Sequence, residues 1–198
     1  MLLVAAGRRP NTDRLHCEKA GLTLGKKGEI VVNKKLETSV PGLYAMGDVT
    51  GSEQFTYLSL DDFRIAKSQL EGTETHTRTN RPVYPKTLFV NPPFSKVGLT
   101  EAEAVREGHL VKTAVMPAAA IPKSHILRET TGVLKVVVDA ESDRILGASL
   151  FCVESYEMIG LLTQAIDMKA DWRTLRDAIY AHPTMTEGFN DLFGLIAD

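Results

Sequence analysis

Short apolar runs that end at glycine characterise the first part of the chain and predict buried strands. Leu2 to Gly7 is one such run, and a polar turn follows it at residues 8–12. Gly28 to Val32 alternates apolar and polar positions, and Leu43 to Asp48 predicts a buried strand that leads into a glycine-aspartate corner. Because a natural domain rarely begins within a strand, we expect sequence before Met1 to supply the neighbours of the first strand.

Helical spacing follows, and then the composition changes. From Tyr57 to Leu70 the apolar residues recur at helical intervals, which places Asp48 between a strand and a helix. Residues 71–82 are polar with almost no apolar side chains, which is typical of a linker. We therefore predict two parts, residues 1–78 and residues 79–198.

Strands followed by helices are predicted beyond the linker. The expected strands are 87–90, 96–99, 110–115, 132–138 and 144–153, and the expected closing helices are 156–168, 172–180 and 185–196. Thr100 with Glu103 three residues later predicts a capping box that starts a further helix. Residues 117–122, with a proline at each end, predict a connector. This order of elements predicts an α+β domain, an antiparallel sheet with helices on one face.

Composition and charge exclude several classes of protein. The chain has 198 residues, 43% of them hydrophobic, and a formal net charge of -2, so it offers no basic footprint for nucleic acid or an anionic membrane. Its apolar runs are too short to span a membrane and its start does not resemble a signal peptide, so a cytoplasmic protein is expected. The two cysteines, Cys17 and Cys152, are far apart, which predicts neither a CxxC motif nor a metal site.

Two short segments carry candidate chemistry. The corner at Gly47 and Asp48 suits a flavin, because glycine lets backbone approach a cofactor and a carboxylate accepts hydrogen bonds from its hydroxyls; the same pair also makes ordinary turns and helix caps. His182 and Glu187 are five residues apart, so a helix that begins near Thr184 lets the carboxylate reach back and orient the imidazole for proton transfer. A histidine before proline can otherwise be a loop or capping residue, and Glu187 a favourable charge in a first helical turn.

Together these segments resemble the pyridine nucleotide-disulfide oxidoreductases, a family that includes dihydrolipoamide dehydrogenase and mercuric reductase. In chain order, residues 6–12, 42–49, 89–101 and 182–187 resemble the turn that leaves the NAD domain, the second FAD signature, the start of the dimerisation domain and its catalytic end. Residues 54–62, 119–122 and 147–150 are most similar to the bacterial reactive-chlorine-response flavoenzymes that reduce hypothiocyanous acid. Mercuric reductase is disfavoured because residues 191–198 lack its vicinal cysteines.

The resemblance implies a homodimeric enzyme in which NAD(P)H reduces FAD, FAD reduces a CxxxxC disulfide, and the dithiol reduces a small oxidant or disulfide substrate. His182 and Glu187 would then be the acid-base pair that serves the partner subunit's disulfide. The implied cofactor-binding residues are Gly7, Gly47, Asp48, Phe55, Thr56 and Tyr57.

The choice between NADH and NADPH stays open at this level, and so does the oxidant. The isolated chain is expected to be inactive, because it contains neither the glycine loop for ADP nor the redox cysteines. Two alternatives also remain: a dimerisation module without FAD or catalysis, and a dithiol-free relative that moves hydride between nicotinamides.

Overall fold

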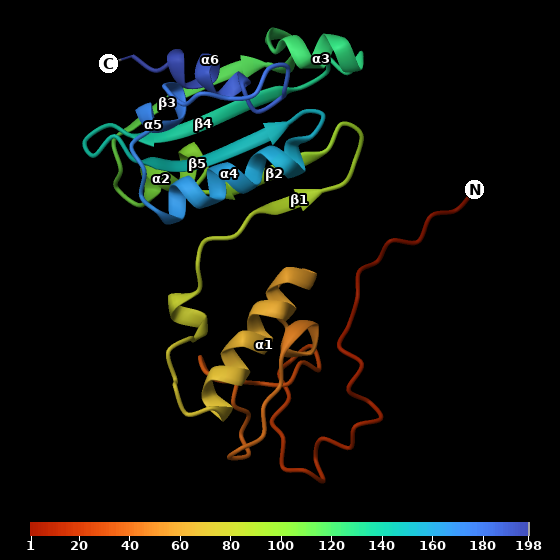
Figure 1. The fold of residues 1–198 in the computed structure, drawn as a ribbon. Coiled ribbons are helices and arrows are strands. Elements are labelled where there is room, and N and C mark those ends of the chain that lie inside the picture. The colour runs from red at the N-terminus through yellow and green to blue at the C-terminus, as the bar shows by residue number, and fades with distance from the viewer. Residues whose placement is uncertain (198) are drawn as a thin grey trace. The chain divides into compact units, whose positions relative to one another are not determined.

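Two compact units, Met1–Arg81 and Pro82–Asp198, make up the chain in the computed structural model, which describes residues 1–197. Figure 1 shows a single long helix in the first unit and a sheet with its helices in the second. Each unit has its own buried cluster of apolar side chains.

The first unit is built around helix α1. Its elements in chain order are η1 (Gly47–Thr50), α1 (Thr56–Leu70) and η2 (Arg78–Asn80). Ile65 and Ala66, on the buried face of α1, pack with Leu36 in a small core. The helix expected from Tyr57 to Leu70 is confirmed, and it begins one residue earlier than its spacing predicted.

The three strands predicted in this unit do not form, and those predictions are wrong. Leu2 to Gly7 is exposed and pairs with no strand within residues 1–197. The other two segments are reduced to single bridges, one that joins Ile30 to Leu24 and one that joins Tyr44 to Glu37. A strand needs a continuous row of backbone partners, and an apolar run by itself does not supply one.

An antiparallel sheet forms the centre of the second unit. Its strands are β1 (Lys86–Leu88), β2 (Phe94–Gly98), β3 (Val111–Pro117), β4 (Val133–Asp139) and β5 (Ile145–Phe151), paired in the order β1-β2-β5-β4-β3. On β4, Leu134, Val136 and Val138 are fully buried, whereas Val133 is exposed. One face of the sheet thus carries the core, and the predicted α+β fold is confirmed.

Helices cover that face. Helix α4 (Ser155–Asp167) contacts β2 and β5, and helix α6 (Gly188–Gly194) contacts β3 and β4, as Figure 1 shows. The shorter helices are α2 (Glu101–Arg106), α3 (Pro122–Leu127) and α5 (Arg173–Arg176). Trp172, Phe189 and Phe193 are the largest fully buried side chains between the helices and the sheet. The capping box of Thr100 and Glu103 at the start of α2 is confirmed.

The segment 117–122 joins β3 to α3, as the predicted connector. It contains a short helix, η3 (Ala118–Ala120), and Pro122 begins α3. Alanine is a strong helix former, and proline fits the first turn of a helix because its missing N–H has no partner there.

Two closing helices are shorter than predicted. The helix expected over 172–180 ends at Arg176. The Asn190 side chain donates to the carbonyls of Arg176 and Ala178, at 2.6 and 2.9 Å, and so satisfies acceptors that have no partner beyond the helix end. The helix expected over 185–196 is confirmed only for its central turns, Gly188–Gly194.

Candidate functional site

His182 and Glu187 lie in the segment that joins α5 to α6. His182 Nδ1 and Glu187 Oε2 are 2.8 Å apart, so the contact predicted from their spacing is confirmed. The imidazole side chain is 69% exposed, whereas the glutamate side chain is 18% exposed. The pair therefore presents the imidazole to solvent and keeps the carboxylate beneath it.

A reciprocal turn between Thr184 and Glu187 fixes the position of the carboxylate. Glu187 Oε1 accepts a hydrogen bond from the Thr184 backbone N–H at 3.0 Å, and the Glu187 N–H donates to Thr184 Oγ1 at 3.2 Å. This is the arrangement of a capping box, and the Thr-x-x-Glu spacing was the sequence signal by which Thr184 could have been found. One carboxylate oxygen is held by backbone, which leaves the other for the imidazole.

Side chains outside the motif attach this segment to the core. Asn190 donates to carbonyls of the α5 end, and the Tyr180 hydroxyl donates to the Leu175 carbonyl at 3.0 Å. The Tyr180 ring meets Phe189 edge to face, with centroids 6.4 Å apart. Burial raises the pKa of Tyr180 to about 12, so this phenol is a neutral structural group at neutral pH. Neither Asn190 nor Tyr180 has a local sequence signal for this role.

The charges at the pair determine which nitrogen can accept a proton. The hydrogen bond from His182 lowers the pKa of Glu187 and outweighs the opposing effect of burial, and the Thr184 N–H acts in the same direction as His182. An ionised carboxylate only accepts hydrogen bonds, so the shared hydrogen belongs on His182 Nδ1. His182 Nε2 then carries the lone pair, and it has no hydrogen-bond partner in the part of the chain that the structure describes. Such an imidazole can accept a proton at Nε2, and the carboxylate stabilises the cation that results.

The second candidate site is the glycine-aspartate corner. Gly47 has a φ of +72°, and a Cβ added there would lie 2.7 Å from Ser59 Oγ of α1, so the position requires glycine. The Gly47 N–H donates to Asp62 Oδ2 at 2.8 Å. Asp48 follows in η1 with an exposed side chain. The corner thus closes tightly against α1 on one side and presents a carboxylate on the other.

Asp48 borders a hollow of about 420 Å³. Its lining also includes Arg8, Arg9, Lys27, Glu29 and Gln54. Among residues 1–197 the Asp48 carboxylate has no hydrogen-bond or ion-pair partner, so it is available to accept bonds from hydroxyl groups. A carboxylate beside three cationic side chains fits the polyhydroxyl and phosphate portion of a flavin dinucleotide.

Phe55, Thr56 and Tyr57 form the N-terminal end of α1, with Phe55 as its N-cap residue. The rings of Phe55 and Tyr57 stack with centroids 5.0 Å apart. The N–H groups of a first helical turn point away from the helix and favour negative charge, which suits the predicted cofactor contact. Gly7 is not brought into this arrangement: it is exposed, and the hollow begins at its neighbour Arg8.

Neither cysteine is placed to act as a redox thiol. Cys17 and Cys152 are both buried, and neither forms a disulfide. Burial raises the pKa of Cys152 to about 12, so its thiolate is not populated at neutral pH. Within residues 1–197 no group of histidine, cysteine and carboxylate side chains is arranged to hold a metal ion, and no helix is both long and apolar enough to cross a membrane.

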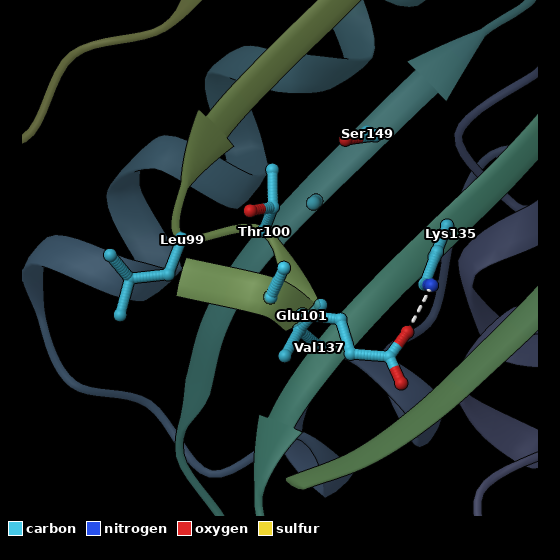
Figure 2. Close-up of a pocket in the computed structure, with 8 residues that line it drawn as sticks. Leu99, Thr100, Glu101, Lys135, Val137 and Ser149 are labelled. Carbon is cyan, nitrogen blue, oxygen red and sulfur yellow. Dashed lines mark hydrogen bonds and ion pairs between the residues drawn. The ribbon is translucent and has the colours of Figure 1, made fainter. Parts of the chain in front are cut away.

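A further hollow, of about 320 Å³, lies beside β4 and β5 (Figure 2). The side chains that Figure 2 labels around it are Leu99, Thr100, Glu101, Lys135, Val137 and Ser149. Lys135 Nζ is 2.5 Å from Glu101 Oε2, so the two charges neutralise each other. The described lining includes none of the residues predicted for the site, and it offers no unpaired charge to a ligand.

Comparison with known families shows which family the chain belongs to. The family "Pyridine nucleotide-disulphide oxidoreductase, dimerisation domain" matches residues 84–193, more than half of the chain, and "Pyridine nucleotide-disulphide oxidoreductase" matches residues 1–71. The chain belongs to the pyridine nucleotide-disulphide oxidoreductases. The resemblance of its motifs to this family is therefore confirmed.

Similar members of the pyridine nucleotide-disulphide oxidoreductases include the Escherichia coli protein named probable pyridine nucleotide-disulfide oxidoreductase RclA. It is 45% identical over 195 residues, which cover 98% of this chain and 44% of RclA. Mercuric reductase of Staphylococcus aureus is 38% identical over 94% of this chain and 34% of that enzyme. The solved structure of "HOCl-induced flavoprotein disulfide reductase RclA from Escherichia coli" matches with a TM-score of 0.95, at 45% identity over 98% of this chain and 45% of that one. The chain thus spans less than half the length of these relatives.

Proposed function

We propose that this chain is the C-terminal portion of a flavin-dependent NAD(P)H:disulfide-type oxidoreductase. Residues 79–198 supply the dimer interface, and residues 1–78 belong to the FAD and NAD(P) part. In the homodimer, His182 and Glu187 act as the acid-base pair on the partner subunit's disulfide. The substrate class proposed is a small oxidant, hypothiocyanous acid or a related species.

The single observation that carries the proposal is the 2.8 Å contact between His182 Nδ1 and Glu187 Oε2, with the imidazole exposed. A thiolate is the reactive form of a thiol, so a disulfide reductase needs a base that takes the thiol proton and later returns it. His182 Nε2 is free to do both within the described residues. Glu187 holds the ring in the required tautomer and stabilises its charged form.

FAD, when bound, accepts hydride from NAD(P)H and transfers the electrons onward. The residues of this chain that would hold it are Asp48, whose exposed carboxylate would accept hydroxyl hydrogen bonds, and the first turn of α1 at Thr56 and Tyr57. Gly47 shapes the corner that presents Asp48. The redox disulfide must come from other residues, because both cysteines of this chain are buried and separate.

The oxidant is proposed from similarity. The E. coli relative is named for its induction by HOCl and as a flavoprotein disulfide reductase, and this chain is 45% identical to it over the shared length. That name supports a disulfide reductase with a role in oxidant defence.

The test uses His182→Ala in the full-length enzyme. We expect flavin reduction by NAD(P)H to stay fast in stopped-flow measurements, whereas turnover with hypothiocyanous acid falls about 100-fold, the range of a lost acid-base group. His125→Ala, at an exposed histidine of α3, is the matched control and should turn over like the parent enzyme. Unchanged turnover of His182→Ala across neutral pH would show that His182 has only a structural role.

Two alternatives are separated by other measurements. The first alternative is a dimerisation module without catalysis, which suits a chain whose cysteines are both buried. If the purified chain shows no flavin absorbance, this function is favoured for the isolated segment. A dithiol-free relative would transfer hydride between nicotinamides and would not respond to thiol alkylation. Loss of oxidant reduction on alkylation of the reduced full-length enzyme would exclude this second alternative.

A further inference from the structure

A buried ionic cluster joins α1 to the segment that follows it in the first unit. Asp61 and Asp62 are neighbours on α1 with exposed fractions of 9% and 0%. Arg81 contacts both carboxylates, with its Nε 2.5 Å from Asp61 Oδ2 and its Nη2 hydrogen-bonded to Asp62 Oδ1. Arg78 Nη2 lies 3.2 Å from Asp62 Oδ2, and His76 Nε2 lies 2.8 Å from Asp61 Oδ1. Two guanidinium groups thus neutralise two carboxylates, one fully buried and one nearly so.

Of the two carboxylates, only that of Asp62 contacts the glycine-aspartate corner. Asp62 Oδ2 accepts the Gly47 N–H at 2.8 Å. The Gly47 carbonyl accepts a hydrogen bond from the Thr50 hydroxyl at 2.8 Å, and Arg78 donates to that hydroxyl at 2.7 Å. The cluster therefore binds the Gly47 N–H directly and reaches its C=O through the Thr50 hydroxyl. No recorded bond joins Asp61 to the corner within residues 1–197.

We propose that Asp62 is a positioning residue for cofactor binding: it holds the backbone of Gly47 so that the Asp48 carboxylate faces the hollow beside Arg8. Arg78 and Arg81 compensate the buried charge and keep the Asp62 side chain in this orientation. The segment after α1, which carries Arg78 and Arg81, thereby helps to hold the glycine-aspartate corner through Asp62. The inference rests on the proposed binding of FAD.

The experiment compares Asp62→Ala with Asp61→Ala in the full-length enzyme, stripped of flavin and titrated with FAD. Both variants remove a buried carboxylate that Arg81 binds, but only Asp62→Ala leaves the Gly47 N–H without its acceptor. We expect the Kd for FAD to rise about tenfold in Asp62→Ala and to stay within about twofold in Asp61→Ala. In the flavin-free proteins, hydrogen exchange at the Gly47 amide should accelerate in Asp62→Ala alone.

Each other outcome decides against the inference. If folded Asp62→Ala binds FAD like the parent enzyme, Asp62 does not position the corner, although the proposed function stands. If both variants weaken FAD binding equally, the cluster acts through general stability and not through Gly47. If the parent enzyme binds no FAD, the proposed function and the inference fail together.

A second variant keeps the test decisive where Asp62→Ala does not fold. Asp62→Asn preserves the size of the side chain, but its amide can accept hydrogen bonds on only one side, either at Gly47 or at Arg81. If the amide oxygen turns to Arg81, hydrogen exchange at the Gly47 amide should accelerate and the Kd for FAD should rise at least about threefold. If the oxygen stays at Gly47, neither should change. A change in one measurement without the other would overturn the inference.

Discussion

Glu187→Gln tests the chemistry of the acid-base pair with the smallest change of shape. The glutamine can still accept the Thr184 N–H through its carbonyl oxygen, as Glu187 Oε1 does at 3.0 Å. Its NH₂ group then faces His182 Nδ1, where the carboxylate oxygen stood at 2.8 Å. Because an NH₂ group only donates, His182 Nδ1 must become the acceptor and the ring hydrogen moves to Nε2. The substitution keeps the contact and removes the base from the exposed nitrogen.

The expected magnitude follows from the interaction that is lost. A hydrogen bond to a charged group contributes about 1.5–3 kcal/mol, and each 1.4 kcal/mol corresponds to about a factor of ten, so turnover should fall about 10- to 100-fold. Stability at neutral pH should change by less than about 1 kcal/mol, because the backbone bond at Thr184 is retained.

The pH dependence has a definite sign. The pKa of Glu187 is lowered in the folded chain from its ordinary value of 4.5, so its contribution to stability is complete above that value. This contribution is lost as the pH falls through the lowered pKa. Glu187→Gln should abolish that acid-side loss, which thermal melts over the acid range can measure.

The assay measures steady-state NAD(P)H oxidation with the oxidant, together with stopped-flow reduction of the flavin. Flavin reduction should be unchanged, which locates the defect at the proton transfer. Glu129→Gln, at an exposed glutamate, is the matched control. Turnover of Glu187→Gln within about twofold of the parent enzyme would show that catalysis does not need Glu187 to keep the ring hydrogen on His182 Nδ1, whatever the result for His182→Ala.

Three further outcomes are expected. Asp139→Asn should lower the free energy of unfolding by about 1–2 kcal/mol at neutral pH, because hydrogen bonds from the Ser142 N–H and from His109 lower the pKa of this carboxyl from 3.8 to about 2. That stabilisation is complete above 3.8 and is lost as the pH falls towards 2, so the parent and variant melting temperatures should converge there. Gly188→Ala should cost about 1–3 kcal/mol in denaturant unfolding, since its Cβ would lie 2.6 Å from the Ile121 side chain, whereas Gly160→Ala, with nothing within 4 Å, should stabilise α4 by about 0.5–1 kcal/mol. Equal effects of the two alanines would contradict this packing argument. Because both cysteines are buried, they should react with a thiol reagent only on unfolding. Rapid labelling of the folded chain would show that the thiols are accessible to solvent.

Local patterns predicted much of the second unit. The β3, β4 and β5 segments, helix α4 and the capping box at Thr100 were each visible as alternation, helical spacing or a cap signal. The same patterns failed in the first unit, where apolar runs at residues 2–7 and 28–32 have too few backbone partners to become strands. An apolar run favours burial, but a strand exists only where a neighbouring strand pairs with it.

The sequence by itself determined the five-residue spacing of His182 and Glu187, and the glycine that shapes the corner before Asp48, because both depend on groups close together in the chain. Tertiary structure decided what holds these groups. Asp62 reaches Gly47 across fifteen residues, and Asn190 reaches the end of α5 across fourteen. Such contacts depend on how helices pack, and packing brings together residues whose separation in sequence follows no local period.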